Sequence, residues 1–136
     1  MQRILVIDDE PFVREALQRV LKSASVTVVG TADAAAGLAE MRESPVDLVI
    51  VDVVLPGMDG VAAIKKIREE YPATQIIAIS GGGNFGLSAY QPEAISTSAY
   101  LAACTAAGAD GTLAKPFETS ELRALIEGLP KRSAAH

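Results

Sequence analysis

Five polar residues in this chain lie at the ends of short apolar runs. They are Asp8, Asp9, Asp52, Ser80 and Lys115. Carboxylates that crowd together repel one another, and this favours a bound hard cation with oxygen ligands, such as Mg²⁺. A lysine supplies a compact positive charge for a phosphate, and a serine supplies a hydroxyl donor. A carboxylate beside a metal and a lysine is a nucleophile toward phosphorus in enzymes that form an aspartyl-phosphate.

Each of these residues also has an ordinary structural interpretation when it is taken alone. Asp8, Asp9 and Asp52 could cap the helices that follow them, because aspartate is a common N-cap residue. Ser80 could be a turn residue, and Lys115 could be a surface charge. The hypothesis of one phosphate-directed site depends on all of them lying at strand ends, in this order along the chain.

The apolar runs that precede these residues have the pattern of strands buried on both faces. They are short, uninterrupted and rich in β-branched residues. We expect strands at 4–7, 26–29, 48–51, 75–79 and 111–114, with Gly30 closing the second. Segments with helical spacing lie between them: one begins at Pro11, and others cover 34–42, about 61–67, a stretch ending near 107, and a last one from about 118.

This alternation of strands and helices indicates an α/β fold. Right-handed crossovers between consecutive strands give a parallel sheet with helices on both faces. In such a sheet the carboxyl ends of the strands meet at one edge, where ligands bind in open α/β folds. The five polar residues are therefore expected to lie together at that edge.

Composition narrows the class of protein. The chain has 136 residues, of which 49% are hydrophobic and 21% charged, and this suits a single globular domain. A net charge of −5 argues against direct nucleic-acid binding. The single cysteine, Cys104, is expected to be a small buried residue, in a chain suited to the cytoplasm. No signal peptide or membrane-spanning run is evident.

The motif combination resembles the receiver domain of bacterial two-component response regulators. The matching segments are ILVIDDE at 4–10, Asp52 with LPGMDG at 55–60, Ser80, and AGADG at 107–111 leading to KPF at 115–117. The resemblance covers residues 3–127. It implies a flavodoxin-like (CheY-like), doubly wound five-stranded parallel sheet with strand order 2-1-3-4-5. We expect a receiver domain over residues 1–128 and a flexible tail over 129–136.

The resemblance also implies a role for each residue of the acidic group. Asp52 is the phosphoacceptor and also a ligand of the metal ion. Asp9 is the direct ligand of Mg²⁺, with Mn²⁺ as an alternative, and Asp8 acts largely through water. The backbone carbonyl of Val54 completes the protein ligands. Phosphorylation adds about −1.5 to −2 charge and three acceptor oxygens at Asp52.

Two further positions respond to that charge in the family. By the resemblance, Lys115 pairs with the phosphoryl group, and Ser80 hydrogen-bonds one of its oxygens and acts as a switch. The second switch position, three residues before the lysine, usually holds Tyr or Phe, whereas here it is Thr112. The stretch from Ser80 to Lys115 is also longer than the family's usual spacing, with a glycine-rich insert at about 81–93.

The insert has two interpretations. Long loops are often functional, so one of its aromatic residues could replace the missing aromatic and reshape the output face. Alternatively, it is a tolerated surface insertion, because lengthening a loop costs little free energy.

By the same resemblance, the partners are a sensor histidine kinase or histidine phosphotransferase and an output protein or domain. The output face is the last two helices and the strand between them. No membrane partner and no enzymatic activity are expected beyond the domain's own Mg²⁺-dependent autophosphorylation and autodephosphorylation.

Other function classes fit the sequence less well. A phosphatase of the haloacid dehalogenase type needs a second Asp two residues after the nucleophile, where this chain has Val54. An FMN carrier needs a phosphate loop after the first strand, where Asp8 and Asp9 would repel a phosphate. A receiver that binds partners without being phosphorylated remains the alternative, because Thr112 replaces the usual aromatic.

Overall fold

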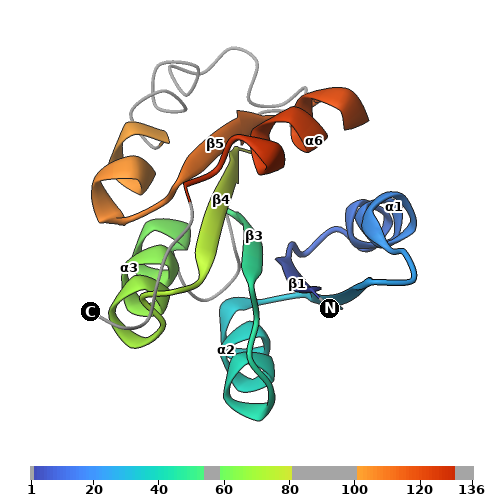
Figure 1. Ribbon diagram of the computed structural model, residues 1–136. Helices are drawn as coiled ribbons and strands as arrows, with labels where there is room; N and C mark the ends of the chain where they lie inside the picture. Colours follow the sequence, from blue (N-terminus) through green and yellow to red (C-terminus); the bar gives the residue numbers. More distant parts are fainter. Residues whose placement is uncertain (1, 54–58, 81–100, 131–136) are drawn as a thin grey trace.

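A computed structural model describes residues 2–53, 59–80 and 101–130 of the chain (Figure 1). Its strands and helices alternate along the chain, as expected from the periodicity. In order they are β1 (Gln2–Ile7), α1 (Pro11–Leu21), β2 (Val26–Thr31), α2 (Ala34–Glu43), β3 (Leu48–Asp52), α3 (Gly60–Glu70), β4 (Gln75–Ser80), β5 (Gly111–Ala114) and α6 (Thr119–Glu127). A further helical stretch covers 101–107.

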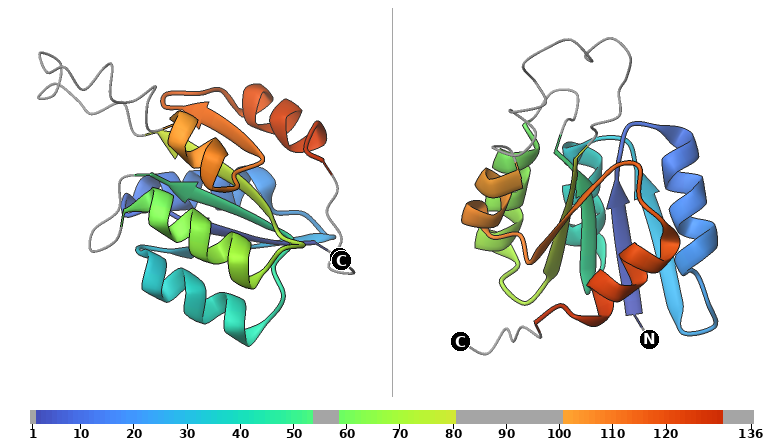
Figure 2. Two further views of the ribbon diagram at one scale, coloured as in Figure 1. Left: turned by 90° about the vertical axis from the view of Figure 1, so that its left-hand side faces the viewer. Right: turned by 90° about the horizontal axis from the view of Figure 1, so that it is seen from above.

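The five strands form one sheet in the order β2-β1-β3-β4-β5, and all neighbouring pairs are parallel. This confirms the predicted flavodoxin-like topology. Helices cover both faces of the sheet, as the two views of Figure 2 show. Because β3 is the middle strand, the residues at its carboxyl end have neighbours on both sides.

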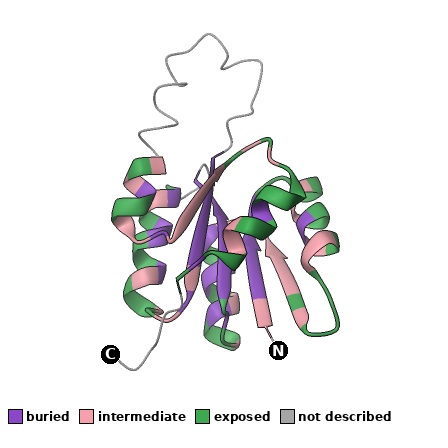
Figure 3. Cartoon of the chain, turned by 45° about the horizontal axis from the view of Figure 1, so that its top comes forward, coloured by how far each residue is buried: buried purple, intermediate pink, exposed green. Residues whose placement is uncertain are grey.

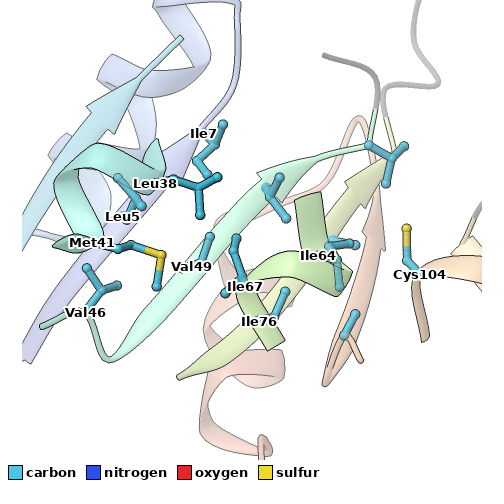
Figure 4. Packing of buried hydrophobic residues seen from close by; sticks show 14 residues of the cluster. Leu5, Ile7, Leu38, Met41, Val46, Val49, Ile64, Ile67, Ile76 and Cys104 are labelled. Carbon is cyan, nitrogen blue, oxygen red and sulfur yellow. The ribbon is translucent and has the colours of Figure 1, made fainter. Parts of the chain in front are cut away.

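Two layers of apolar side chains hold the helices to the sheet, and Figure 3 shows the central strands as the most buried part of the chain. One layer packs α2, α3 and the 101–107 helix on one face, through residues such as Leu38, Ile64 and Cys104 (Figure 4). The other packs α1 and α6 on the opposite face, through Leu17 and Leu122. Cys104 is fully buried, which confirms its prediction as a core residue.

The alternation of side chains along the strands determines on which face of the sheet each polar residue lies. Leu48 and Ile50 pack in the α1–α6 layer, and Asp52 has the same parity on β3. Leu113 also packs in that layer, and Lys115 follows it by two positions. Asp52 and Lys115 therefore lie on the α1–α6 side of the sheet edge.

Local sequence signals account for several of the helix ends. Asp33 and Asp59 are N-caps whose side chains accept hydrogen bonds from the backbone N–H of Ala36 at 2.8 Å and of Val61 at 2.9 Å, respectively. Gly108 ends the 101–107 helix with φ +127°, a conformation that glycine adopts without strain.

The strand β2 is longer than the sequence predicted. It continues through Gly30 to Thr31, because Gly30 and Thr31 pair with Val6 and Ile7 of β1. Glycine is usually a strand breaker, but here the side chain of Arg14 lies 3.2 Å from where a Cβ would be, so a bare backbone suits this packing.

Some predictions fall at or beyond the limits of the described residues. Val54 and the proposed insert at 81–93 lie outside them. Leu129, in the segment predicted as a tail, is buried in the α1–α6 layer, and the carbonyl of Pro130 accepts a hydrogen bond from Gln75 at 2.7 Å. Among the described helices, none has the length and apolar character needed to cross a membrane.

Candidate functional site

Three carboxylates meet at the carboxyl edge of the sheet. One oxygen from each of Asp8, Asp9 and Asp52 lies within 4.8 Å of the others. Asp8 is fully buried and Asp52 is 4% exposed, whereas Asp9 is exposed to solvent. The structure therefore brings together the three aspartates that the sequence placed at this edge, with one of them facing outward.

Lys115 joins this group from the end of β5. Its ammonium donates hydrogen bonds to Asp8 Oδ2 at 2.9 Å, to Asp52 Oδ2 at 3.1 Å and to Glu10 Oε1 at 3.2 Å. Its backbone N–H donates to the carbonyl oxygen of Ser80 at 3.0 Å, and this bond continues the pairing of β5 with β4. The lysine is thus held by the sheet on one side and by carboxylates on the other.

The charges in this site do not balance. Burial by itself lowers the pKa of the Lys115 ammonium, but hydrogen bonds and charge attraction from Asp8 and Asp52 outweigh burial and hold that pKa above its ordinary value. Lys115 therefore stays protonated at neutral pH. One lysine charge faces four neighbouring acidic side chains, those of Asp8, Asp9, Glu10 and Asp52. A surplus of carboxylate oxygens of this kind is the donor set that Mg²⁺ prefers.

The turn between β1 and α1 fixes the acidic pair. The backbone N–H of Asp8 donates to the carbonyl of Thr31 at 3.0 Å, so Asp8 is still anchored to β2. Asp8 Oδ1 accepts the backbone N–H of Glu10 at 2.9 Å, and the carbonyl of Asp8 accepts a guanidinium hydrogen bond from Arg14 at 2.8 Å. These bonds hold one Asp8 oxygen toward its own backbone and leave the other for Lys115.

Ser80 lies at this edge of the sheet, whereas Thr112 lies farther back along β5. Ser80 is 3% exposed and ends β4, in register with Ala114 of β5. Thr112 is half-buried and pairs with Ala78, two positions back from that edge. Ala78 packs in the layer formed with α2, α3 and the 101–107 helix. Because side chains alternate along a strand, Ser80, two positions later, lies on the same face of the sheet. Ser80 and Thr112 thus share the face opposite to Asp52 and Lys115.

Two residues that contact the site have no role predicted from the sequence. Glu10 pairs with Lys115, and Arg14 holds the Asp8 backbone. Both follow the acidic pair closely in the chain. Nothing in the sequence shows whether a side chain in the first turn of a helix turns toward the sheet edge or toward solvent.

A groove of about 440 Å³ opens beside the site, between α1 and α6. Glu10 and Lys115 are among its lining residues, and most of the others are apolar residues of α1, of the segment that precedes α6, and of α6 itself. Phe12 borders the groove and is 71% exposed, which is high for a large apolar side chain. The groove is thus an apolar surface directly adjoining the charged group.

Comparison with protein families gives a match over almost the whole chain. The model of the family described as "Response regulator receiver domain" matches residues 4–127. The matched span contains all five polar residues with which the sequence analysis began.

Individual proteins similar to the chain include a transcriptional regulator and a two-component response regulator. The DNA-binding transcriptional regulator NtrC of Escherichia coli is 30% identical over 131 residues, which cover 93% of this chain and 25% of NtrC. The two-component response regulator PhoP of Pseudomonas aeruginosa is 30% identical over 132 residues, covering 97% of this chain and 53% of PhoP. The chain thus spans about half or less of the length of these relatives.

Solved structures of similar shape agree with these matches. The Vibrio cholerae chemotaxis protein CheY4 superposes with a TM-score of 0.74 at 26% identity, covering 96% of this chain and 99% of that one. A two-component response regulator of the LuxR family from an Aurantimonas species superposes with a TM-score of 0.73 at 31% identity, covering 92% of this chain and 81% of that one.

Proposed function

Because this chain belongs to the response regulator receiver family, we propose that Asp52 is its phosphoacceptor and that phosphorylation of Asp52 switches a partner-binding surface. The observation that carries this proposal is the position of Asp52. It lies at the carboxyl end of the central strand, 3.1 Å from the Lys115 ammonium and within the cluster of three aspartates. Asp8 shares the cation and the cluster, but its other carboxylate oxygen accepts the backbone N–H of Glu10, and only Asp52 of the three stands on the central strand.

The acidic cluster suits Mg²⁺. Three carboxylates contribute oxygens within 4.8 Å of one another, and the exposure of Asp9 leaves room for the several waters that Mg²⁺ keeps. We propose that Asp9 and Asp52 bind the ion directly, that Asp8 acts largely through water, and that the Val54 carbonyl completes the protein ligands; Mn²⁺ is an alternative ion. When bound, such an ion neutralises charge on the transferring phosphoryl group and helps to orient it.

The transfer itself is a displacement at phosphorus. A carboxylate oxygen of Asp52 forms the new O–P bond, and the bond from phosphorus to the donor breaks. The leaving atom, a histidine nitrogen of a kinase or phosphotransferase, keeps the electron pair. Lys115 donates hydrogen bonds to the oxygens of the transferred group, and its ammonium offsets part of the added charge.

In this proposal, the response to phosphorylation involves residues on the face of the sheet opposite to Asp52. The Ser80 hydroxyl donates to a phosphoryl oxygen, and this draws the end of β4 toward Asp52. Thr112 lies on the same face as Ser80, so it is the next residue to sense that movement. The surface formed by the last two helices and β5 then changes its affinity for an output protein or domain, which is a shift between two packings of the chain.

Receiver domains of response regulators are generally not enzymes, and for this one we propose no reaction beyond its own phosphorylation and dephosphorylation. One relative, NtrC, is a DNA-binding transcriptional regulator. For this domain we propose protein partners alone, on the ground of its net charge of −5. We further propose that the receiver unit spans 1–128, with Leu129 and Pro130 packed against it.

The test is phosphorylation by acetyl phosphate, followed by intact mass, with and without Mg²⁺. Wild-type protein should gain one phosphoryl group only when Mg²⁺ is present, and Asp52→Asn should gain none. Asp47→Asn is a matched control, because Asp47 precedes the same strand at its other end. If wild-type protein gained nothing and also failed to bind beryllofluoride with Mg²⁺, the phosphoacceptor proposal would be wrong.

A further inference from the structure

The Lys115 ammonium has already used its full hydrogen-bonding capacity. An ammonium carries three N–H donors. Three carboxylate oxygens accept from it, those of Asp8, Glu10 and Asp52, at 2.9, 3.2 and 3.1 Å. A phosphoryl oxygen arriving at the site must therefore compete with a carboxylate for Lys115.

The three carboxylates differ in what else they do. Asp52 receives the phosphoryl group in the proposed function, and Asp8 belongs to the acidic cluster. Glu10 does neither, and its side chain is 49% exposed, against 0% for Asp8 and 5% for Asp52. Glu10 is the partner of Lys115 that water solvates most readily, so it can give up the ammonium at the lowest free-energy cost.

The backbone around Glu10 shows that its side chain has no role in capping the helix. Glu10 is the N-cap residue of α1, and its carbonyl accepts the first backbone hydrogen bonds of the helix from Val13 and Arg14. An acidic N-cap side chain commonly accepts from the backbone N–H groups of the first turn. Here the Glu10 side chain makes no such bond and points to Lys115.

We propose that Glu10 is a positioning residue that competes with the phosphoryl group for the Lys115 ammonium and thereby shortens the lifetime of the phosphorylated state. This inference rests on the proposed role of Asp52. While Glu10 holds one proton of the ammonium, it also cancels part of the charge that Lys115 offers to the phosphoryl oxygens. Removing the Glu10 charge leaves more of that charge for the phosphoryl group.

The experiment compares Glu10→Gln with Glu15→Gln. Both substitutions change the net charge equally, but Glu15 is exposed on α1 and makes no ion pair with the described residues. Beryllofluoride affinity is measured by titration at saturating Mg²⁺, and dephosphorylation is followed by intact mass. We expect Glu10→Gln to bind beryllofluoride about three- to fivefold more tightly and to lose phosphate more slowly by a similar factor, as suits a half-exposed ion pair. Glu15→Gln should match wild type.

A second measurement needs neither metal nor phosphate. The urea midpoint is compared for wild type, Glu10→Gln, Lys115→Met and the double variant in EDTA. If Glu10 holds Lys115 in solution, Glu10→Gln should be more destabilising in the wild-type background than in Lys115→Met, where Glu10 faces only like charges. Additive midpoints would show that the contact is absent and would overturn the inference.

The outcomes separate this inference from the proposed function. If wild-type protein binds beryllofluoride and Asp52→Asn does not, Asp52 keeps its role whatever Glu10 does. If Glu10→Gln then binds no more tightly than Glu15→Gln, competition by Glu10 is wrong. Failure of wild-type protein to bind beryllofluoride would contradict the phosphoacceptor role and this inference with it.

Discussion

Replacing Gly60 by alanine tests whether the close approach of α3 to the end of β3 is needed for folding. Gly60 is the first residue of α3, and its backbone N–H donates to the carbonyl of Val53 at 3.0 Å. A Cβ on Gly60 would lie 2.3 Å from Val53 Cα, 2.6 Å from its carbonyl oxygen and 2.7 Å from its carbonyl carbon. All three atoms belong to the backbone, so no side chain can rotate away from the clash.

The cost of this substitution follows from the distances. An ordinary contact begins at 3.4 Å, so the two segments must separate by about 1 Å. Such overpacking costs about 1–3 kcal/mol, and loss of the Gly60 to Val53 hydrogen bond adds about 1 kcal/mol. Replacing glycine by alanine returns part of this through helix propensity. We expect a net loss of about 1–3 kcal/mol, out of the roughly 5–15 kcal/mol of a typical domain.

The assay is urea unfolding followed by circular dichroism in the helical region, because the chain has no tryptophan. With a typical slope of about 2 kcal/mol/M, the midpoint should fall by roughly 0.5–1.5 M. Since Val53 directly follows Asp52, phosphorylation by acetyl phosphate should also slow. Gly128→Ala is the matched control: its Cβ would lie 3.5 Å from the carbonyl oxygen of Ala124, an ordinary contact. Equal midpoints for the two variants would refute the argument.

Two other perturbations test the structure away from the phosphorylation site. Asp110→Ala should destabilise the fold by about 3 kcal/mol in urea unfolding, because the Asp110 side chain is 2% exposed and pairs with Arg68 at 2.9 Å. Lys66→Ala is the control. It removes only an exposed ion pair, with Glu70, and should leave the urea midpoint nearly unchanged. Burial, followed by the charge of Asp59, raises the pKa of Cys104 to about 11. A thiol reagent at pH 8 should therefore label Cys104 slowly in native protein and fast in urea, and rapid native labelling would contradict its burial. The thiol of Cys104 has a higher pKa in the folded protein than in the unfolded chain, so it ionises first in the unfolded chain. The free energy of unfolding should therefore fall as pH rises from about 8.5 toward 11.

Much of the fold was predictable because local sequence and global topology agree. The apolar runs, four of the five ending in a polar residue, determine parallel strands, and the alternation with helices determines the doubly wound sheet. The alternation of side chains along a strand also determines which face a residue lies on. Asp52 follows Ile50 by two positions, so both side chains lie on the same face of the sheet. The end of β2 was missed because pairing with β1 outweighs the low strand propensity of Gly30.

The sequence by itself determined which residues meet at the carboxyl edge of the sheet, because parallel strands bring their ends together whatever their side chains are. Only the tertiary structure decided how those residues divide their interactions. Lys115 is separated from Glu10 by 105 positions and from Asp52 by 63, and no local pattern tells which carboxylates it will contact. That choice depends on the angle at which α1 leaves β1 and on how closely β5 packs against β4. These are outcomes of packing the two apolar layers, and they place a Glu10 side chain that could have capped its own helix against a lysine at the far end of the chain.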